Sequence, residues 1–179
     1  MSNNTYNGPA YKYLGTNYEE YLFSEQIYKN IDYVSTLNDN IPWFILYTPH
    51  IAHMPLQLPQ NIYEQYDFDN DENLCYNHSE QHKAGYIYPN QTWSGNTGYR
   101  CRSQYHGMVY ILDNIIGNIT YMLKSKNLWD NTLIVFSTDN GGSLWLESNA
   151  GNNYPMKGGK FVPWEGSVKY ISYICHLCV

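Results

Sequence analysis

The sequence predicts an α/β fold with a mostly parallel sheet flanked by helices. Two short runs, at residues 43–47 and 132–137, are apolar at successive positions, which is typical of strands buried on both faces. Between these runs, residues 104–127 place apolar side chains three and four positions apart, which predicts a long amphipathic helix. Strands that alternate with helices in this way favour a parallel sheet.

The composition is that of one folded domain. The chain has 179 residues, of which 43% are hydrophobic and 17% aromatic, so a hydrophobic core is expected. The formal net charge of −6 argues against a nucleic-acid partner, because phosphate binding needs clustered lysine and arginine side chains. No run of about 20 apolar residues predicts a membrane span. The polar residues 1–4 lack the apolar core of a signal peptide.

The first half of the chain reads as a polar segment followed by a helix and a strand. Apolar residues at helical spacing predict a helix from Glu20 to about Val34. The apolar run at residues 43–47 follows and stops at prolines. His50 and His53 are therefore expected on a loop at the C-terminal end of this strand.

The next segment of the chain has little regular pattern. Residues 60–103 show no clear period, and we expect mainly loop there, with a short helix near residues 62–66. The long helix is expected to break at residues 129–131. The second strand, residues 132–137, then runs into a polar loop that begins at Thr138.

That polar loop carries candidate metal ligands. Asp139 offers a carboxylate and Asn140 an amide oxygen, and these hard donors suit calcium or magnesium. Gly141 and Gly142 allow a ligand to approach the backbone closely. Ligands of parallel sheets bind beyond the carboxyl ends of the strands, so this loop and the loop of His53 are expected to meet at one site. A simple turn that closes the strand is the alternative for Asp139 and Asn140.

Two lysines stand beside glycines further along the chain. Lys157 and Lys160 flank the pair Gly158 and Gly159, and an ammonium group next to exposed backbone amides suits an oxyanion. His53 is a candidate proton donor or anion ligand. The alternatives are a solvated basic turn for the lysines and an ordinary surface position for His53.

The chain also contains candidate modification sites. Cys75 and Cys101 either form a disulfide or are two free thiols. Asn-x-Ser/Thr sequons, which also arise by chance, occur at Asn3, Asn77, Asn90 and Asn118. We take Asn77, Asn90 and Asn118 as candidate glycosylation sites.

The motifs occur together in an order that resembles the sulfatase family, nearest to arylsulfatase B-like enzymes. The similarity covers residues 10–169, with residues 72–103 as an apparent insertion and residues 170–179 as a divergent tail. The motifs that carry it are His53–Pro59 (HMPLQLP), Tyr105–Val109 (YHGMV), Ser137–Gly142 (STDNGG), Gly159–Lys160 and Trp164–Val168 (WEGSV).

The resemblance implies a fold like that of alkaline phosphatase. It also implies hydrolysis of sulfate esters on sulfated sugars such as glycosaminoglycans, in a lysosomal or secreted protein. Asp139 and Asn140 would bind calcium. Lys160 would contact the sulfate and the leaving oxygen, and His53 would bind the sulfate or protonate the leaving group.

The chain departs from the family at the nucleophile. The family converts a cysteine in a Cys-x-Pro/Ala-x-Arg motif to formylglycine, and none of the four cysteines here lies in that motif. The family's first Asp-Asp calcium ligands would precede residue 1. We therefore expect residues 1–179 to be a partial sulfatase catalytic domain that is inactive alone. We also expect it to fold poorly, because an incomplete sheet exposes apolar edges.

Two alternatives to a sulfatase segment stay open. One is a non-catalytic protein that binds sulfated glycans, which fits the missing nucleophile. The other is a phosphatase or phosphodiesterase of the same superfamily. That alternative fits Asp139 and His53, but it does not fit the sequence from Lys160 to Gly166.

Overall fold

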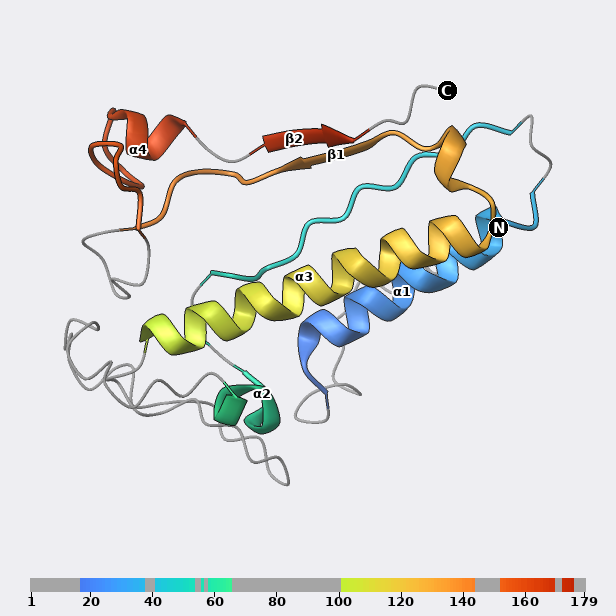
Figure 1. The fold of residues 1–179 in the computed structure, drawn as a ribbon, viewed down its shortest axis with the longest axis horizontal. Coiled ribbons are helices and arrows are strands. Elements are labelled where there is room, and N and C mark those ends of the chain that lie inside the picture. The colour runs from blue at the N-terminus through green and yellow to red at the C-terminus, as the bar shows by residue number, and fades with distance from the viewer. Residues whose placement is uncertain are drawn as a thin grey trace, which may run out of the picture.

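The computed structural model describes residues 17–37, 41–53, 56, 58–65, 101–143, 152–169 and 172–175. Its elements are α1 (Glu19–Val34), α2 (Gln60–Gln65), α3 (Cys101–Ser125), the 3-10 helix η3 (Trp129–Asn131), β1 (Ile134–Ser137), α4 (Glu165–Val168) and β2 (Ser172–Cys175). Figure 1 shows two layers, with α1 beside α3 and an extended layer of residues 41–50, β1 and β2 next to them. The helices in this part of the chain are too short or too polar to cross a membrane.

Helix α1 confirms the helix predicted from Glu20 to Val34 and begins one residue earlier. Three- and four-residue spacing puts its buried side chains on one face. These side chains are Glu20, Ser24, Ile27 and Ile31. The helix therefore buries an apolar stripe that has a carboxylate at its N-terminal end.

Helix α3 confirms the long predicted helix, but it begins at Cys101, inside the expected insertion. Its inward face is apolar along most of the helix, with Met108, Ile111, Ile115 and Leu123 buried. Beyond the helix, Asn127 has a φ of 57°, in the left-handed region that often terminates helices. The chain then enters η3, which lies where the break was predicted.

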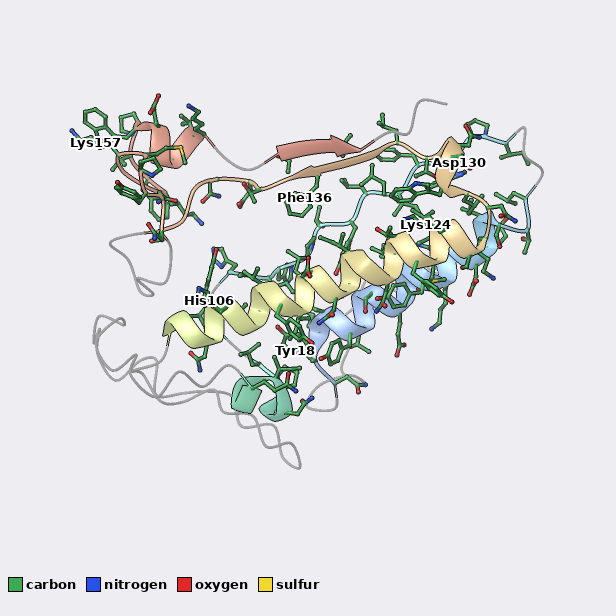
Figure 2. The ribbon with its side chains drawn as sticks, in the orientation of Figure 1. Tyr18, His106, Lys124, Asp130, Phe136 and Lys157 are labelled. Atoms are coloured by element: carbon green, nitrogen blue, oxygen red, sulfur yellow. The ribbon has the colours of Figure 1, made fainter. Side chains whose placement is uncertain are left out.

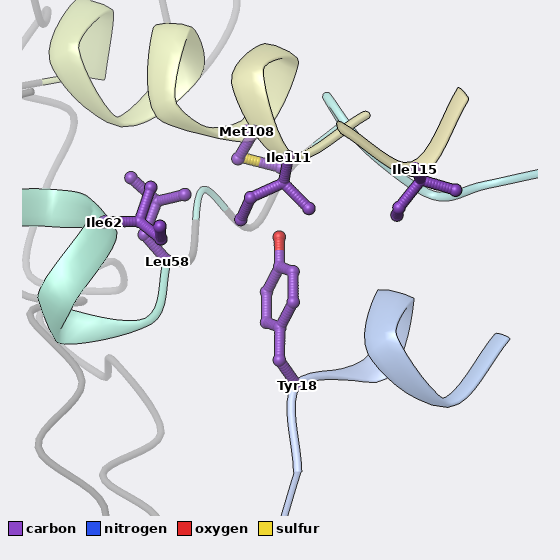
Figure 3. Close-up of a cluster of buried hydrophobic side chains, with 6 residues drawn as sticks. All are labelled: Tyr18, Leu58, Ile62, Met108, Ile111 and Ile115. Carbon is purple, nitrogen blue, oxygen red and sulfur yellow. The ribbon is translucent and has the colours of Figure 1, made fainter. Parts of the chain in front are cut away.

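Two clusters of buried side chains hold the layers together. Figure 3 shows the first, which joins α2 and α3 and consists of Tyr18, Leu58, Ile62, Met108, Ile111 and Ile115. The second is formed by Ile27, Ile31 and Leu123, and Trp43 and Ile45 of the extended layer pack against it. Full burial of one such side chain contributes about 1.5–3 kcal/mol. The partly buried Trp43 and Ile45 join the extended layer to the second cluster.

The hydrogen-bonded sheet of the described residues is antiparallel, so the prediction of a mostly parallel sheet is not met there. β1 pairs with β2, in a register that joins Ile134 to Cys175. β2 lies in the segment expected as a divergent tail. Residues 43–47 are extended without ladder hydrogen bonds, although Figure 1 shows them running in the same direction as β1. An antiparallel pair needs only a chain reversal between its strands, with no crossover helix.

The extended layer is covered on one face only within the described residues, so the predicted burial on both faces is wrong there. Successive side chains of an extended segment point to opposite faces, and the helices lie on one side (Figure 1). Trp43, Ile45 and Ile134 pack toward the helices. The exposed side chains between them are Phe44 (85%), Leu46 (74%), Leu133 (60%) and Val135 (62%).

Candidate functional site

The loop after residues 43–47 is held against the start of α1 by a buried carboxylate. Glu20 is only 1% exposed. Its Oε2 accepts a hydrogen bond from the Tyr47 hydroxyl at 3.0 Å, and its Oε1 accepts from the backbone N–H groups of His50 at 2.7 Å and Ile51 at 3.3 Å. Burial, together with the carboxylate beside it, raises the pKa of the Tyr47 hydroxyl well above its usual range.

A tight turn continues this loop to His53. The backbone N–H of His53 donates to the carbonyl of His50 at 2.9 Å. The ring of His50 contacts the neighbouring helix instead, with its Nδ1 3.0 Å from Oε2 of Glu19. Both of these side chains are well exposed, so the pair contributes little to stability. Of the two histidines of this loop, His50 therefore faces α1, and His53 faces residues from the second half of the chain.

The two glycines after β1 pack directly against α4 and the loop that carries the lysines. The N–H of Gly141 donates to the carbonyl of Ser167 at 2.9 Å, and the N–H of Lys160 donates to the carbonyl of Gly142 at 3.1 Å. A Cβ atom at Gly141 would collide with the carbonyl oxygen of Gly166. Only glycine permits this close approach of two backbone segments.

The side chain of Asn153 ties these two segments together. Its Oδ1 accepts from the N–H of Gly142 at 2.9 Å, and its Nδ2 donates to the carbonyls of Gly142 at 2.8 Å and Gly158 at 3.1 Å. Gly158 has a φ of 83°, which glycine adopts without strain. The backbone that carries Lys160 is therefore set by a network of short hydrogen bonds.

The two loops bring His53 and Lys160 together, although the residues are 107 positions apart in the sequence. The Nζ of Lys160 lies 3.2 Å from the Nε2 of His53. An ammonium group has only N–H donors, so Nε2 of His53 is the acceptor when Lys160 carries its charge. His53 is exposed and Lys160 is half-buried. A small oxyanion that enters here would meet an ammonium group and an imidazole side by side.

Asp139 and Asn140 follow β1 directly, the first exposed and the second half-buried. Both line the same wide cleft as His53 and Lys160, but this cleft also runs along much of α1. Among the described residues, no group of three or more His, Cys, Asp or Glu side chains is placed to hold a metal ion. Calcium takes six to eight oxygen ligands, so these two donors suit it in kind but do not form a complete site.

Lys157 lies on the same loop as Lys160 but has a different neighbour. Its Nζ is 3.8 Å from the centroid of the Trp164 ring, a cation–π contact. Lys124 makes a similar contact with Trp129 at 4.8 Å. Figure 2 shows Lys157 and Lys124 well apart along the long axis of the molecule. Lys124 is therefore a natural control for changes at the lysine loop.

Neither Glu20 nor Asn153 is predicted from the sequence as part of this site. Glu20 has a detectable signal, because it stands four residues before Ser24 and seven before Ile27, on the buried stripe of α1. A charged residue at such a position must find hydrogen-bond partners. Asn153 has no comparable signal, since an asparagine in a glycine-rich segment is typical of any loop.

The predicted modification sites lie mostly outside the described residues. Asn118 is exposed on α3, where its Nδ2 donates to the hydroxyl of Tyr28 at 3.3 Å. The sequons at Asn3, Asn77 and Asn90, together with Cys75, fall on segments that the structure does not describe.

Comparison with known proteins gives one consistent family. A model of the Sulfatase family matches residues 1–169. Arylsulfatase J of Mus musculus is 26% identical over 159 residues, which are 88% of this chain and 21% of that protein. N-acetylgalactosamine-6-sulfatase of Canis lupus familiaris is 33% identical over 69 residues, which are 38% of this chain and 13% of that protein.

A solved structure has a similar fold. The crystal structure of Ps i-CgsB in complex with k-i-k-neocarrahexaose matches with a TM-score of 0.61 and 28% identity, over 89% of this chain and 28% of that chain. The uncomplexed crystal structure of Ps i-CgsB matches equally well. The chain thus spans well under a third of the length of these relatives.

Proposed function

Because the chain belongs to the sulfatase family, we propose that it forms the sulfate-contacting part of a sulfuric ester hydrolase that acts on sulfated sugars. The observation that carries the proposal is the 3.2 Å contact between Nζ of Lys160 and Nε2 of His53. Two separate hydrogen-bonded loops build this contact, and it presents a fixed positive charge beside a group able to carry a proton.

The two side chains have distinct roles in this proposal. Hydrolysis of a sulfate ester builds negative charge on the sulfate oxygens and on the leaving oxygen, and a preorganised ammonium group stabilises that charge. Lys160 supplies the ammonium group. His53 binds a sulfate oxygen or passes a proton to the leaving oxygen, as imidazoles commonly do in acid–base catalysis.

Asp139 and Asn140 are proposed as two ligands of a calcium ion. Their carboxylate and amide oxygens are the donors that calcium prefers. A bound calcium ion would supply positive charge near the sulfate, and it needs further ligands beyond these two. Asp139→Asn is expected to weaken calcium binding in an isothermal titration, because it removes the charged donor of the pair. An unchanged affinity would count against this assignment.

The names of the relatives support a substrate class for this proposal. Ps i-CgsB was crystallised with k-i-k-neocarrahexaose, an oligosaccharide, and another relative is named for N-acetylgalactosamine 6-sulfate ester chemistry. We propose a sulfated carbohydrate as the substrate here too, met in a lysosomal or secreted location. Candidate glycosylation of Asn118, which is exposed on α3, is compatible with such a location.

A second candidate function is binding of sulfated glycans without hydrolysis. The specific observation in its favour is the pairing of Lys160 with His53, because an ammonium group beside an imidazole can hold a sulfate group without any further chemistry. This function needs the contact between Lys160 and His53 but no nucleophile.

A binding experiment with matched lysine variants tests the part that both functions share. Lys160→Gln is expected to weaken binding of a monosulfated disaccharide about tenfold or more, because hydrogen bonds to charged groups contribute roughly 1.5–3 kcal/mol. Lys124→Gln, at the lysine that contacts the Trp129 ring, is expected to leave the affinity unchanged. Equal losses in the two variants would refute a specific sulfate contact at Lys160.

Turnover separates the hydrolase from the binding protein and from a phosphatase. The product of the complete transcript is incubated with p-nitrophenyl sulfate and, separately, with p-nitrophenyl phosphate. A sulfatase releases p-nitrophenol from the sulfate ester, a phosphatase prefers the phosphate ester, and a binding protein retains the sulfated sugar without releasing product from either ester.

A further inference from the structure

The carboxylate of Glu20 occupies an unusual place for a charged group. It lies in the buried face of α1 at 1% exposure, at the junction between the helical layer and the loop of His53. Burial of a carboxylate is costly unless hydrogen bonds replace the lost water. The contacts of Glu20 therefore show what the residue holds in place.

Within the described residues, the three hydrogen bonds to the Glu20 carboxylate come from a single stretch of chain. The hydroxyl of Tyr47 donates to one oxygen, and the consecutive N–H groups of His50 and Ile51 donate to the other. Two successive amides that point at one anionic oxygen fix the direction of the backbone between them. The carboxylate thus determines how the chain leaves the extended layer.

The hydrogen bonds continue from this point to the proposed sulfate contact. The carbonyl of His50 accepts the N–H of His53 at 2.9 Å, and the ring of His53 then meets Nζ of Lys160 at 3.2 Å. Asn153 and Gly142 hold the opposite side of the contact, through the backbone of Lys160. Each half of the contact therefore has its own buried or half-buried anchor.

We propose that Glu20 is a positioning residue that sets the place of His53 opposite Lys160. It contacts neither sulfate nor reacting atoms and acts through the turn of residues 50–53. The inference rests on the proposed function for its catalytic meaning. The geometric part, that Glu20 holds His53 beside Lys160, is measurable without any substrate.

The experiment compares Glu20→Ala and Glu20→Gln with two controls. Leu123→Ala creates a cavity in the second core cluster, leaves the hydrogen bonds of the Glu20 carboxylate in place, and matches the general loss of stability. Glu19→Gln removes the neighbouring exposed carboxylate, whose contact with the His50 ring is weak. Glutamine at position 20 keeps one oxygen for the two backbone amides and is the conservative rescue.

The substrate-free readout is the NMR spectrum of the His53 ring. We expect Glu20→Ala to shift the His53 ring signals and to abolish the nuclear Overhauser contact between this ring and Lys160. Leu123→Ala and Glu19→Gln should preserve both, and Glu20→Gln should restore most of the wild-type spectrum. A preserved ring contact in Glu20→Ala would overturn the inference, whatever the fate of the proposed function.

The second readout is affinity for the monosulfated disaccharide. Glu20→Ala is expected to bind about tenfold more weakly, because small displacements of a positioned group are costly, whereas Leu123→Ala binds as the wild type does. Equal losses of affinity in the two variants would mean that Glu20 only stabilises the fold in general. Failure of the wild type to bind the sugar refutes the proposed function alone, since the ring contact is scored separately.

Discussion

The helical layer and the extended layer bury their apolar residues in different ways. The helices α1 and α3 each present one apolar stripe, and the described structure covers it, with Ile31 and Met108 at 2% exposure. The extended layer is apolar on both faces, but only the face toward the helices is covered, and Phe44 on the other face is 85% exposed. A helix with one apolar face needs one packing partner to bury that face. An extended segment that is apolar on both faces needs a partner on each side.

The difference shows where the stability of the described residues resides. The face toward the helices joins residues far apart in the sequence, such as Ile31 of α1, Ile45 and Leu123 of α3. The outer face of the extended layer adds no comparable contact within the described residues. The expectation that the chain folds poorly alone stays a prediction, and a cooperative thermal transition of the 179-residue protein would contradict it.

The largest effect is expected from truncation on the covered side. Ile31→Ala should lower the free energy of unfolding by about 2–5 kcal/mol, because it leaves a cavity in the core. Leu46→Ala, at a position that is 74% exposed, should change it by no more than about 0.5 kcal/mol. Urea unfolding followed by circular dichroism measures both, and similar losses would mean that the outer face is buried in solution.

A second prediction compares the stability effects of alanine at Gly141, which packs closely in the site, and at Gly117, which lies on α3. Gly141→Ala should lower the free energy of unfolding by about 1–3 kcal/mol, because the added methyl collides with the backbone at Gly166. Gly117→Ala on α3 meets nothing within 4 Å and should raise stability by about 0.4–1 kcal/mol. Thermal melts of the two variants should therefore move in opposite directions, and a shared direction would disprove the close approach at Gly141.

Alkaline pH should weaken the attachment of the His53 loop to α1. The folded protein raises the pKa of Tyr47 above its ordinary value near 10, so the unfolded chain releases this proton first as the pH rises. The contribution of Tyr47 is complete below about pH 10 and is then lost by up to about 1.4 kcal/mol per pH unit as the pH rises toward the folded pKa.

Tyr47→Phe should reduce the slope with which the free energy of unfolding falls at alkaline pH, by the contribution of one tyrosine. Tyr33→Phe is the matched control, since the Tyr33 side chain is 66% exposed. Denaturation curves between about pH 9 and pH 11 measure the slope. If both variants kept the wild-type slope, the Tyr47 hydroxyl would not be held in a buried hydrogen bond with Glu20.

The smallest change in stability is expected on the outer face. Val135→Lys should leave the free energy of unfolding within about 0.5 kcal/mol of the wild type, because the side chain is already 62% exposed. It should also reduce self-association, since contiguous exposed apolar residues favour aggregation. Sedimentation velocity at several concentrations measures the association. A strongly destabilised Val135→Lys would show that this face packs against another part of the chain.

Much of the secondary structure was predictable because it depends on neighbours along the chain. The periods of α1 and α3 and the break at residues 129–131 follow from side-chain spacing alone. The boundary at Cys101 was missed by three residues relative to the predicted start, because the polar first turn of α3 carries no apolar period.

The site was predictable in part. Strand ends and prolines indicated that His53 lies on a loop, and the family resemblance implied that His53 and Lys160 both contact the sulfate. The structure brings these two side chains together. Glu20 was not predicted, because its function depends on a loop about thirty residues further along the chain. The assignments of Asp139 and Asn140 to calcium stay predictions, since no group of three or more His, Cys, Asp or Glu side chains among the described residues is placed to hold a metal ion.

The sequence by itself determined the helices, the loops at the strand ends and the family motifs. Each of these features depends on residues that lie close together in the sequence. Only the tertiary structure decided that β1 pairs with β2 in antiparallel register, which face of the extended layer is covered, and which carboxylate anchors His53. Those outcomes depend on contacts between distant segments. The free energy of such contacts depends on how the whole molecule packs. The spacing of side chains along the sequence therefore predicts little of it.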